Sequence, residues 1–229
     1  MKIPPVKALI FMKHYSERVS RKNMRLLCGR PLFHWIMDAL SHSKYITEII
    51  INTDSEEISK NARENFDVTI HMRPEYLFQI NSNEANQIMA YDLTQTDGEY
   101  FLQTHSTNPL LTTKTIDKAI EEFFEMDEND SLFTVTPLQK RFYWSDGSPI
   151  NHDPHNMIKT QLLPVIYEEN SCIYMFSRIV FEKHSDRIGR NPKLLPVDRM
   201  EAIDIDEEDD FMLAEYFMKE RLKSGSAFI

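Results

Sequence analysis

Short apolar runs alternate with amphipathic stretches along this chain, and the alternation predicts its fold. Runs rich in β-branched and aromatic residues predict strands at Val6–Met12, Glu48–Thr53, Val68–His71, Tyr100–Gln103, Ser131–Pro137, Ser171–Ser177 and Glu201–Ile205. Apolar positions at helical spacing predict helices at Leu32–Leu40, Glu84–Thr96, Thr113–Met126 and Glu207–Leu222, with another after a cap at Asp54 and Ser55. This order is typical of βαβ units. We therefore expect an α/β fold of three layers, with helices on both faces of a mostly parallel, twisted sheet.

One segment, residues 138–169, breaks the alternation. It contains three prolines, many polar residues and few periodic runs. We interpret it as an insertion with short strands of its own, and as a possible dimerisation element, within a single domain that spans residues 1–229. Its histidine-containing run at residues 152–155 lies away from the predicted strand ends, so we expect no metal site there.

The composition excludes several classes of protein. Of the 229 residues, 41% are hydrophobic, which suits a globular core, and the longest apolar runs are far too short to span a membrane. The opening residues lack the apolar stretch of a signal peptide. Cys28 and Cys172 are isolated, which disfavours a zinc site or a disulfide framework and fits a reducing cytoplasm.

The net charge of −10 disfavours nonspecific binding to nucleic acid, but it hides a division along the chain. Residues 12–30 contain six bases and one acid, a local charge of +5. Residues 201–215 contain eight acids and no base, a local charge of −8. This asymmetry suggests two chemically distinct surfaces.

The cationic segment follows the first predicted strand, where ligands bind in open α/β sheets. Lys13, Arg18, Arg21 and Lys22 lie within ten residues, and such a loop suits a triphosphate through charge-assisted hydrogen bonds. The chain has neither the GxxxxGK[ST] nor the GxGxxG pattern, so basic side chains rather than glycine backbone would hold the phosphates. On charge alone, a solvated surface loop explains this segment equally well.

The acidic segment contains Asp204 and Asp206, two positions apart on a predicted strand. Side chains at that spacing share one face of a strand, so both carboxylates would point at one cation. Ligands that are all oxygen suit Mg²⁺. The acids that follow also suit the first turn of a helix, where the helix dipole favours negative charge, and we expect Asp209 and Asp210 to be structural.

A series of short motifs, taken in order, resembles the sugar-acid cytidylyltransferases, which comprise the acylneuraminate cytidylyltransferases (CMP-sialic acid synthetases) and their CMP-Kdo relatives. The matching segments are Arg21-Lys22-Asn23, Gly29-Arg30-Pro31-Leu32, Asn52 to Ile58, Met72-Arg73-Pro74, Leu102-Gln103 with Thr107 to Leu110, Asn170 to Tyr174, and Asp204-Ile205-Asp206. Each motif is weak by itself, but together they cover nearly the whole chain. The resemblance implies a nucleotide-diphospho-sugar transferase-like, Rossmann-like fold, a homodimer, Mg²⁺ as cofactor, and CTP and a 2-keto sugar acid as substrates.

The resemblance also implies a reaction and a set of roles. The sugar hydroxyl attacks the α-phosphorus of CTP, and pyrophosphate leaves. Lys22 stabilises charge at the α-phosphate, and Asp206, directly or through the metal, takes the proton from the hydroxyl. The remaining expectations are phosphate contacts from Lys13, Ser16 and Arg18, cytosine or ribose contacts from Asn23, Arg73 and Ser82, sugar contacts from Gln103 and His105, and metal ligation by Asp204 and Asp206.

Some positions depart from the family pattern. Lys13 stands in place of an arginine, and a His-Tyr pair replaces the family's two glycines in the first loop. Glu168 falls where sialic acid enzymes often have a base, and an acid there would repel a sugar carboxylate. These departures argue against sialic acid itself and leave the acceptor open among a related nonulosonate, an octulosonate and a less similar acceptor. The alternatives are another nucleotidyltransferase, a metal-dependent glycosyltransferase of similar fold, and a nucleotide-binding homologue without catalysis.

Overall fold

In the computed structural model, which describes residues 2–78 and 83–225, a central sheet forms in the order β5-β4-β1-β6-β8-β7-β9. Its strands are β1 (Val6–Met12), β4 (Ile46–Thr53), β5 (Thr69–Met72), β6 (Tyr100–Thr104), β7 (Ser131–Leu138), β8 (Ile166–Ser177) and β9 (Pro192–Pro196). A separate two-stranded ribbon pairs β2 (Leu26–Leu27) with β3 (Arg30–Pro31). The first strand lies inside the sheet, which explains why it is apolar throughout except at Lys7.

The sheet is mostly parallel. Strands β5, β4, β1 and β6 run in one direction, and Leu9 of β1 pairs with Ile50 on one side and Gln103 on the other. Strand β8 runs antiparallel to both β6 and β7, whereas β7 and β9 are parallel. The carboxyl ends of the four parallel strands therefore share one edge of the sheet, where ligands bind in such folds.

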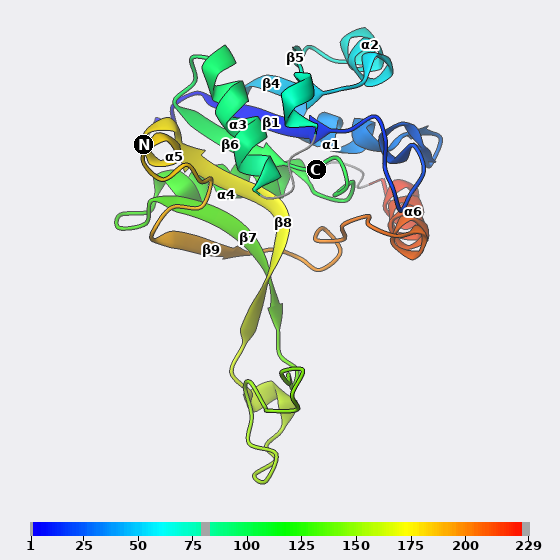
Figure 1. The fold of residues 1–229 in the computed structure, drawn as a ribbon. Coiled ribbons are helices and arrows are strands. Elements are labelled where there is room, and N and C mark those ends of the chain that lie inside the picture. Colours follow the sequence, from blue (N-terminus) through cyan, green and yellow to red (C-terminus); the bar gives the residue numbers. More distant parts are fainter. Residues whose placement is uncertain (1, 79–82, 226–229) are drawn as a thin grey trace.

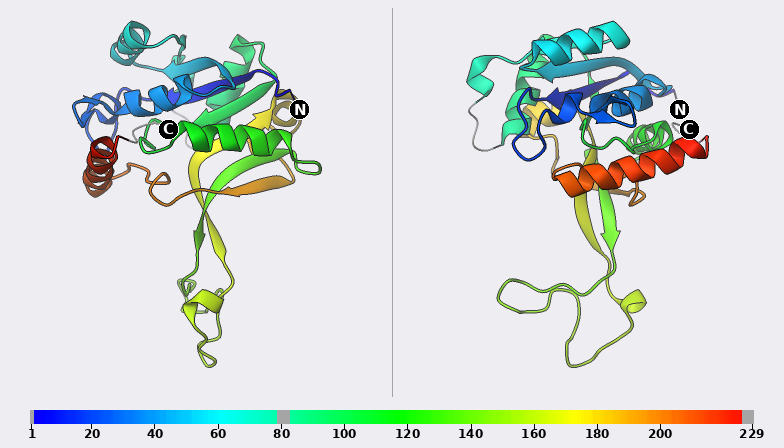
Figure 2. Two further views of the ribbon diagram at one scale, coloured as in Figure 1. Left: turned by 180° about the vertical axis from the view of Figure 1, so that it is seen from behind. Right: turned by 90° about the vertical axis from the view of Figure 1, so that its right-hand side faces the viewer.

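Helices cover both faces of the sheet (Figures 1 and 2). They are α1 (Leu32–Ser41), α2 (Glu56–Asn65), α3 (Glu84–Gln95), α4 (Thr113–Phe124), α5 (Arg178–His184) and α6 (Glu208–Lys223). Residues of α1, α2 and α4 pack with Ile10 and Ile51 in one core cluster, and residues of α3 and α5 pack with Leu9 and Ile50 in another. The side chains of β1 and β4 thus alternate between two apolar layers, which confirms the predicted three-layer α/β fold.

Strands β7 and β8 extend beyond the sheet and form a long arm (Figure 1). Its paired part ends at Leu138 opposite Ile166, and an isolated bridge joins Tyr143 to Pro149 further out. The predicted insertion is therefore mainly this arm, although its last residues belong to β8. Within the described residues, the only regular elements beyond the paired strands are that bridge and a 3₁₀ turn at Thr160–Leu162, so most of the expected short strands do not form.

The last predicted strand, Glu201–Ile205, is wrong: these residues form a turn and an extended loop. The alternation of apolar and acidic residues suits a strand, but the segment makes only one backbone hydrogen bond to its neighbour, from Ile205 N to Thr107 O at 3.0 Å, instead of a ladder. Within the described residues, no helix is both long and apolar enough to cross a bilayer.

Candidate active site

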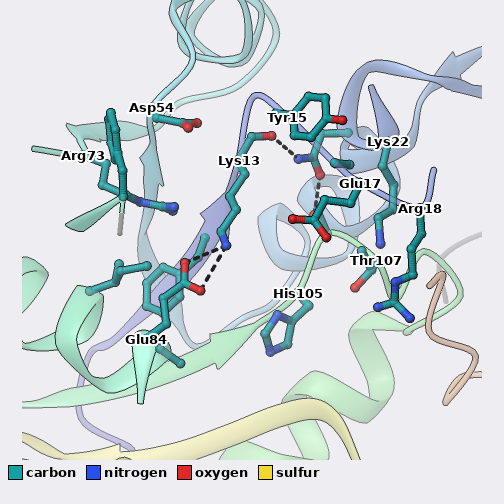
Figure 3. A pocket seen from close by; sticks show the side chains of 17 residues that line it. Lys13, Tyr15, Glu17, Arg18, Lys22, Asp54, Arg73, Glu84, His105 and Thr107 are labelled. Carbon is teal, nitrogen blue, oxygen red and sulfur yellow. Dashed lines mark hydrogen bonds and ion pairs between the residues drawn. The ribbon is translucent and has the colours of Figure 1, made fainter. Parts of the chain in front are cut away.

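A cavity of about 740 Å³ opens at the carboxyl edge of the parallel strands (Figure 3). Four of its lining residues are the first positions after strands β1, β4, β5 and β6, namely Lys13, Asp54, Arg73 and His105. Parallel strands in register place the residues after their ends side by side, so residues far apart in sequence meet here. The cationic loop adds Ser16, Arg18, Lys22 and Asn23 to the lining.

The cationic loop and the acidic segment meet at the rim of this cavity. Arg18 contacts Asp206 with 2.8 Å between Nη2 and Oδ1, and its Nη1 lies 3.2 Å from Glu207. Lys22 Nζ lies 3.7 Å from Asp206 Oδ1 and donates a hydrogen bond to the carbonyl of Ile205. The structure therefore brings together the predicted phosphate-binding and metal-binding residues, which are nearly the length of the chain apart.

Lys13 extends across the cavity toward α3 and pairs with Glu84 at 2.8 Å (Figure 3). It thus occupies a different side from Arg18 and Lys22, and the cations flank the cavity. Glu84 was not singled out from the sequence, because an acid in the first turn of a helix has an ordinary explanation in the helix dipole. Here it also places a negative charge in the cavity.

Asp204 and Asp206 lie on the extended loop beside residues 105–108. Backbone pairing of Ile205 with Thr107 holds this loop at the cavity, in place of the expected strand. The Oδ1 atom of Asp204 is buried and has no hydrogen-bond partner among the described residues, and burial raises the pKa of this carboxyl group. Asp210 accepts hydrogen bonds from the backbone N–H groups of Asp206 and Glu207, the structural role expected for it.

This donor set fits a divalent cation. Both side chains offer carboxylate oxygen, which suits Mg²⁺, and a buried carboxylate oxygen without a partner is a group that a cation would stabilise. Among the described residues, no cluster of three or more histidine, cysteine, aspartate or glutamate side chains is arranged to hold a metal. A cation here would therefore need oxygen ligands from water or substrate in addition to the two aspartates.

Asn23 and Arg73, the expected base or ribose contacts, are both buried. Asn23 donates to the carbonyl of Lys13 at 3.0 Å and accepts from the Ser106 hydroxyl at 2.6 Å, so it links the two loops that line the cavity. Arg73 donates from Nε to Asn52 Oδ1 at 2.7 Å, and burial lowers the pKa of its guanidinium. Ser82, the third expected contact, lies outside the described residues.

The expected sugar contacts, Gln103 and His105, lie together at the end of β6. Their side chains are 3.0 Å apart between Gln103 Nε2 and His105 Nε2. The Oε1 atom of Gln103 accepts a hydrogen bond of 2.6 Å from Nη1 of Arg187. Burial, with smaller effects of Arg187 and Lys22, lowers the pKa of His105 to about 4.

Arg187 was missed by the sequence reasoning. It follows α5, a helix that the pattern did not predict, and no motif surrounds it. Its place beside Gln103 depends on the path of the chain between α5 and β9, which no local pattern specifies. The sequence offered Arg187 only as a basic residue in a polar stretch, which does not indicate a functional site.

Comparison with known proteins identifies the relatives of this fold and site. A profile of the family described as cytidylyltransferase matches residues 7–217. The chain belongs to the cytidylyltransferase family. This confirms the resemblance found in the sequence and the expectation of a CTP-dependent nucleotidyltransferase.

Two relatives of this cytidylyltransferase match almost end to end. The chain is 29% identical over 219 residues to post-translational flagellin modification protein B of Campylobacter coli, covering 90% of this chain and 92% of that protein. It is 26% identical to CMP-N,N'-diacetyllegionaminic acid synthase of Campylobacter jejuni, covering 89% and 90%.

Among solved structures, CMP:2-keto-3-deoxy-manno-octonic acid synthetase complexed with CTP matches the cytidylyltransferase with a TM-score of 0.73. The match covers 95% of this chain and all of the other, with 12% identity. At that identity the comparison establishes the fold, and it agrees with the expected nucleotide-diphospho-sugar transferase-like architecture.

Proposed function

We propose that this cytidylyltransferase transfers CMP from CTP to the anomeric hydroxyl of a sialic-acid-like 2-keto sugar acid and releases pyrophosphate. The observation that carries the proposal is the meeting of Arg18 and Lys22 with Asp206 at the rim of one cavity. The names of the legionaminic acid synthase of Campylobacter jejuni and of the solved synthetase complexed with CTP support it, since both name a CMP-linked sugar acid.

The nucleotide half of the reaction needs positive charge around a triphosphate. Lys22 has 14% of its side chain exposed, against 55% for Lys13 and Arg18, so of these three its interaction with a phosphate would be the strongest. Arg18, Lys13 and Ser16 would bind the outer phosphates, and Asn23 and Arg73 would position the base or ribose. The chain's contribution to rate would be positioning and stabilisation of charge in the transition state.

Asp204 and Asp206 would hold Mg²⁺, as their oxygen donors and the unpartnered Asp204 Oδ1 indicate. Bound there, the cation would neutralise negative charge on the phosphates. Asp206 lies beside Arg18 and Lys22 at the cavity rim, and it is the carboxylate that would accept the proton from the sugar hydroxyl, directly or through the metal.

A second copy of this chain is the proposed partner of the arm. Large apolar side chains on it are solvent-exposed, including Trp144 at 64%, Met157 at 61% and Leu162 at 68%. An extended arm cannot bury these groups against its own domain, and exposed apolar patches of this kind mark interaction sites. We propose a homodimer formed through the arm.

Cys28 and Cys172 are free thiols, which supports a reducing cytoplasm as the location of the protein.

The deciding experiment measures pyrophosphate release with each of CTP, UTP, ATP and GTP against a panel of 2-keto sugar acids, with Mg²⁺. We expect release with CTP and at least one acid. Release with UTP alone would refute the cytidylyl assignment, and release with no pair would refute the proposed enzyme activity.

A variant pair tests the role assigned to Asp206. Asp206→Ala should reduce turnover by at least about 100-fold, on the scale of losing one group that stabilises transition-state charge. The control is Asp209→Ala, which removes an exposed acid from the first turn of α6. Wild-type turnover in Asp206→Ala would exclude both roles proposed for this residue.

A further inference from the structure

Arg187 lies on the loop after α5, beside segments that line the cavity. Its backbone N–H donates to Asn86 Oδ1 at 3.2 Å, and Asn86 is on α3 between the lining residues Ala85 and Ile88. Its side chain reaches Gln103 at 2.6 Å, next to His105, which also lines the cavity. A backbone contact with α3 and a side-chain contact with Gln103 therefore place Arg187 beside the lining residues where β6 terminates.

The guanidinium has no acidic partner. Among the described residues, Lys13, Arg18 and Lys22 each form an ion pair with a carboxylate, whereas Arg187 forms none. It stacks instead on the ring of Tyr174, with 3.6 Å from Cζ to the ring centroid. Arg73 also lacks a carboxylate partner, but it donates to Asn52 and to backbone carbonyls. The side chain of Arg187 donates to Gln103 alone among the described residues, so its guanidinium is available to an anion from outside the chain.

The hydrogen-bond geometry leaves most of the guanidinium available. Only Nη1 donates to a described side chain, so Nε and Nη2 keep their N–H groups. Two parallel N–H groups of a guanidinium match the two oxygens of a carboxylate. The stacked ring of Tyr174 holds the plane of the fork in place, which lowers the entropic cost of binding.

Arg187 also determines how its neighbours present hydrogen-bond donors. Because an arginine only donates, Gln103 must turn Oε1 toward it, so the Gln103 amide nitrogen faces His105 Nε2. That ring nitrogen then accepts, and the proton of the neutral imidazole resides on Nδ1. His105 therefore contributes a donor rather than an acceptor, as an anionic ligand requires.

The acids at the base of the arm do not oppose this arrangement. Glu168, at the position where sialic acid enzymes often have a base, is exposed and pairs across the arm with Thr136. Glu169 accepts a hydrogen bond from the hydroxyl of Tyr174 and forms no ion pair with Arg187. Among the described residues, these two acids thus leave Arg187 without a carboxylate partner.

We infer that Arg187 binds the carboxylate of the sugar acid and sets the preference for an acid over an uncharged sugar. The inference rests on the proposed function, and it names the residue that would recognise the acidic group of the acceptor.

The test compares wild type with Arg187→Gln on an accepted 2-keto sugar acid and on its carboxamide. In the variant, kcat/KM for the acid should fall by about 100-fold, mainly through KM, the scale expected for losing a charge-assisted contact. The preference for acid over carboxamide should disappear, while the Kd of CTP measured by calorimetry stays within about two-fold. A variant that keeps the wild-type preference would overturn the inference.

Two further variants guard against indirect effects. Arg190→Gln removes an exposed base from the same loop and should keep the wild-type preference. Arg187→Lys keeps the charge but loses the fork, and it should retain part of the preference. If Arg187→Gln fails to fold, equal preferences in Arg187→Lys and wild type would overturn the inference instead.

The inference and the proposed function fail in different ways. If no sugar acid is a substrate, the proposed function fails, and calorimetric binding of acid and carboxamide to wild type and Arg187→Gln then decides the role of Arg187. Equal binding of both ligands by wild type would overturn it, and loss of a wild-type preference in the variant would support it.

Discussion

At the scale of single residues, the cavity is defined by pairs of opposite charge. Lys13 pairs with Glu84, and Arg18 pairs with Asp206 and Glu207. A bound triphosphate would compete with these carboxylates for the same cations. Each acid therefore lowers the affinity for nucleotide, unless it has a function of its own once nucleotide is bound. Asp206 has such a function in the proposed reaction, and none is proposed for Glu84.

We predict that Glu84→Gln binds CTP about two- to five-fold more tightly than wild type. The substitution removes a negative charge from the cavity and frees Lys13, whose exposed ion pair is worth on the order of 0.2–1 kcal/mol. Calorimetric Kd values measure the effect. Glu57→Gln is the control, because it breaks the pair with Arg21, which does not line the cavity. Unchanged or weaker binding in Glu84→Gln would contradict the prediction.

His105 makes stability depend on pH. Its pKa is about 4 in the folded protein, below the ordinary value of 6.5, because burial disfavours the charged ring. Between these two values the unfolded chain binds a proton that the folded chain does not. The free energy of unfolding therefore falls as pH drops from about 6.5 to 4, by roughly 2–3 kcal/mol from this group.

His105→Gln should reduce that fall. The measurement is the difference in urea-unfolding free energy between pH 7 and pH 5, for wild type and variant. His155→Gln serves as the control, since His155 is exposed on the arm. An identical pH dependence in wild type and His105→Gln would show that His105 does not titrate as described.

At the scale of elements, local patterns predicted most strands and helices. They failed for elements whose conformation or direction depends on the segments that pack beside them. The segment at residues 201–205 has the alternation of a strand, yet its backbone contacts the loop after β6, at Thr107, rather than an edge strand of the sheet. Strand β9 was missed because prolines at Pro192 and Pro196 mask its short apolar run, and such prolines suit an edge strand. The antiparallel direction of β8 likewise depends on the arm that precedes it.

The capping of α6 connects an element to the site. Asp210 accepts from the backbone N–H groups of Asp206 and Glu207, and Glu207 completes the reciprocal capping box. The first turn of α6 thus fixes the backbone at Asp206. The acids here therefore differ in role, although their sequence is a nearly uniform acidic run.

We predict that Asp210→Ala lowers the free energy of unfolding by about 0.5–2 kcal/mol, the cost of losing a helix cap. It should also slow turnover by less than Asp206→Ala does, because Asp206 keeps its carboxylate but loses its anchor. Urea denaturation and pyrophosphate release measure the two effects. Asp209→Ala changes the exposed neighbour of Asp210, and it should leave both the free energy of unfolding and the turnover unchanged. Equal losses of stability and turnover in Asp209→Ala and Asp210→Ala would refute the specific role of Asp210.

At the scale of the whole molecule, the sequence predicted the layers of the fold and the family. It also singled out residues from both ends of the chain that the structure brings to one cavity. Each of these lies in or beside a motif, as Lys22 and Asp206 illustrate. Arg187 and Glu84 lacked such a context: each meets the cavity only through tertiary packing, and a lone charge in a polar stretch has many ordinary explanations.

The arm leads to a prediction about assembly. Replacing residues 139–165 with an Asn-Gly turn between the paired residues Leu138 and Ile166 should give a folded monomer. Sedimentation equilibrium should report twice the mass of one chain for wild type and a single mass for the variant. Trp144→Asp, a milder change on the arm, should weaken the dimer. A monomeric wild type, or a dimeric variant without the arm, would contradict the proposed interface.

The contact between Arg18 and Asp206 joins residues 188 positions apart, and this separation has a consequence for biosynthesis. At about 5–20 residues per second, the cationic loop leaves the ribosome roughly ten seconds or more before Asp206 is made. Throughout that interval its bases lack their C-terminal acids, and the loop is exposed to any polyanion nearby. Docking of the 201–215 segment is therefore a late event in maturation, and a nucleotide that needs both ends of the chain stabilises only the completed protein.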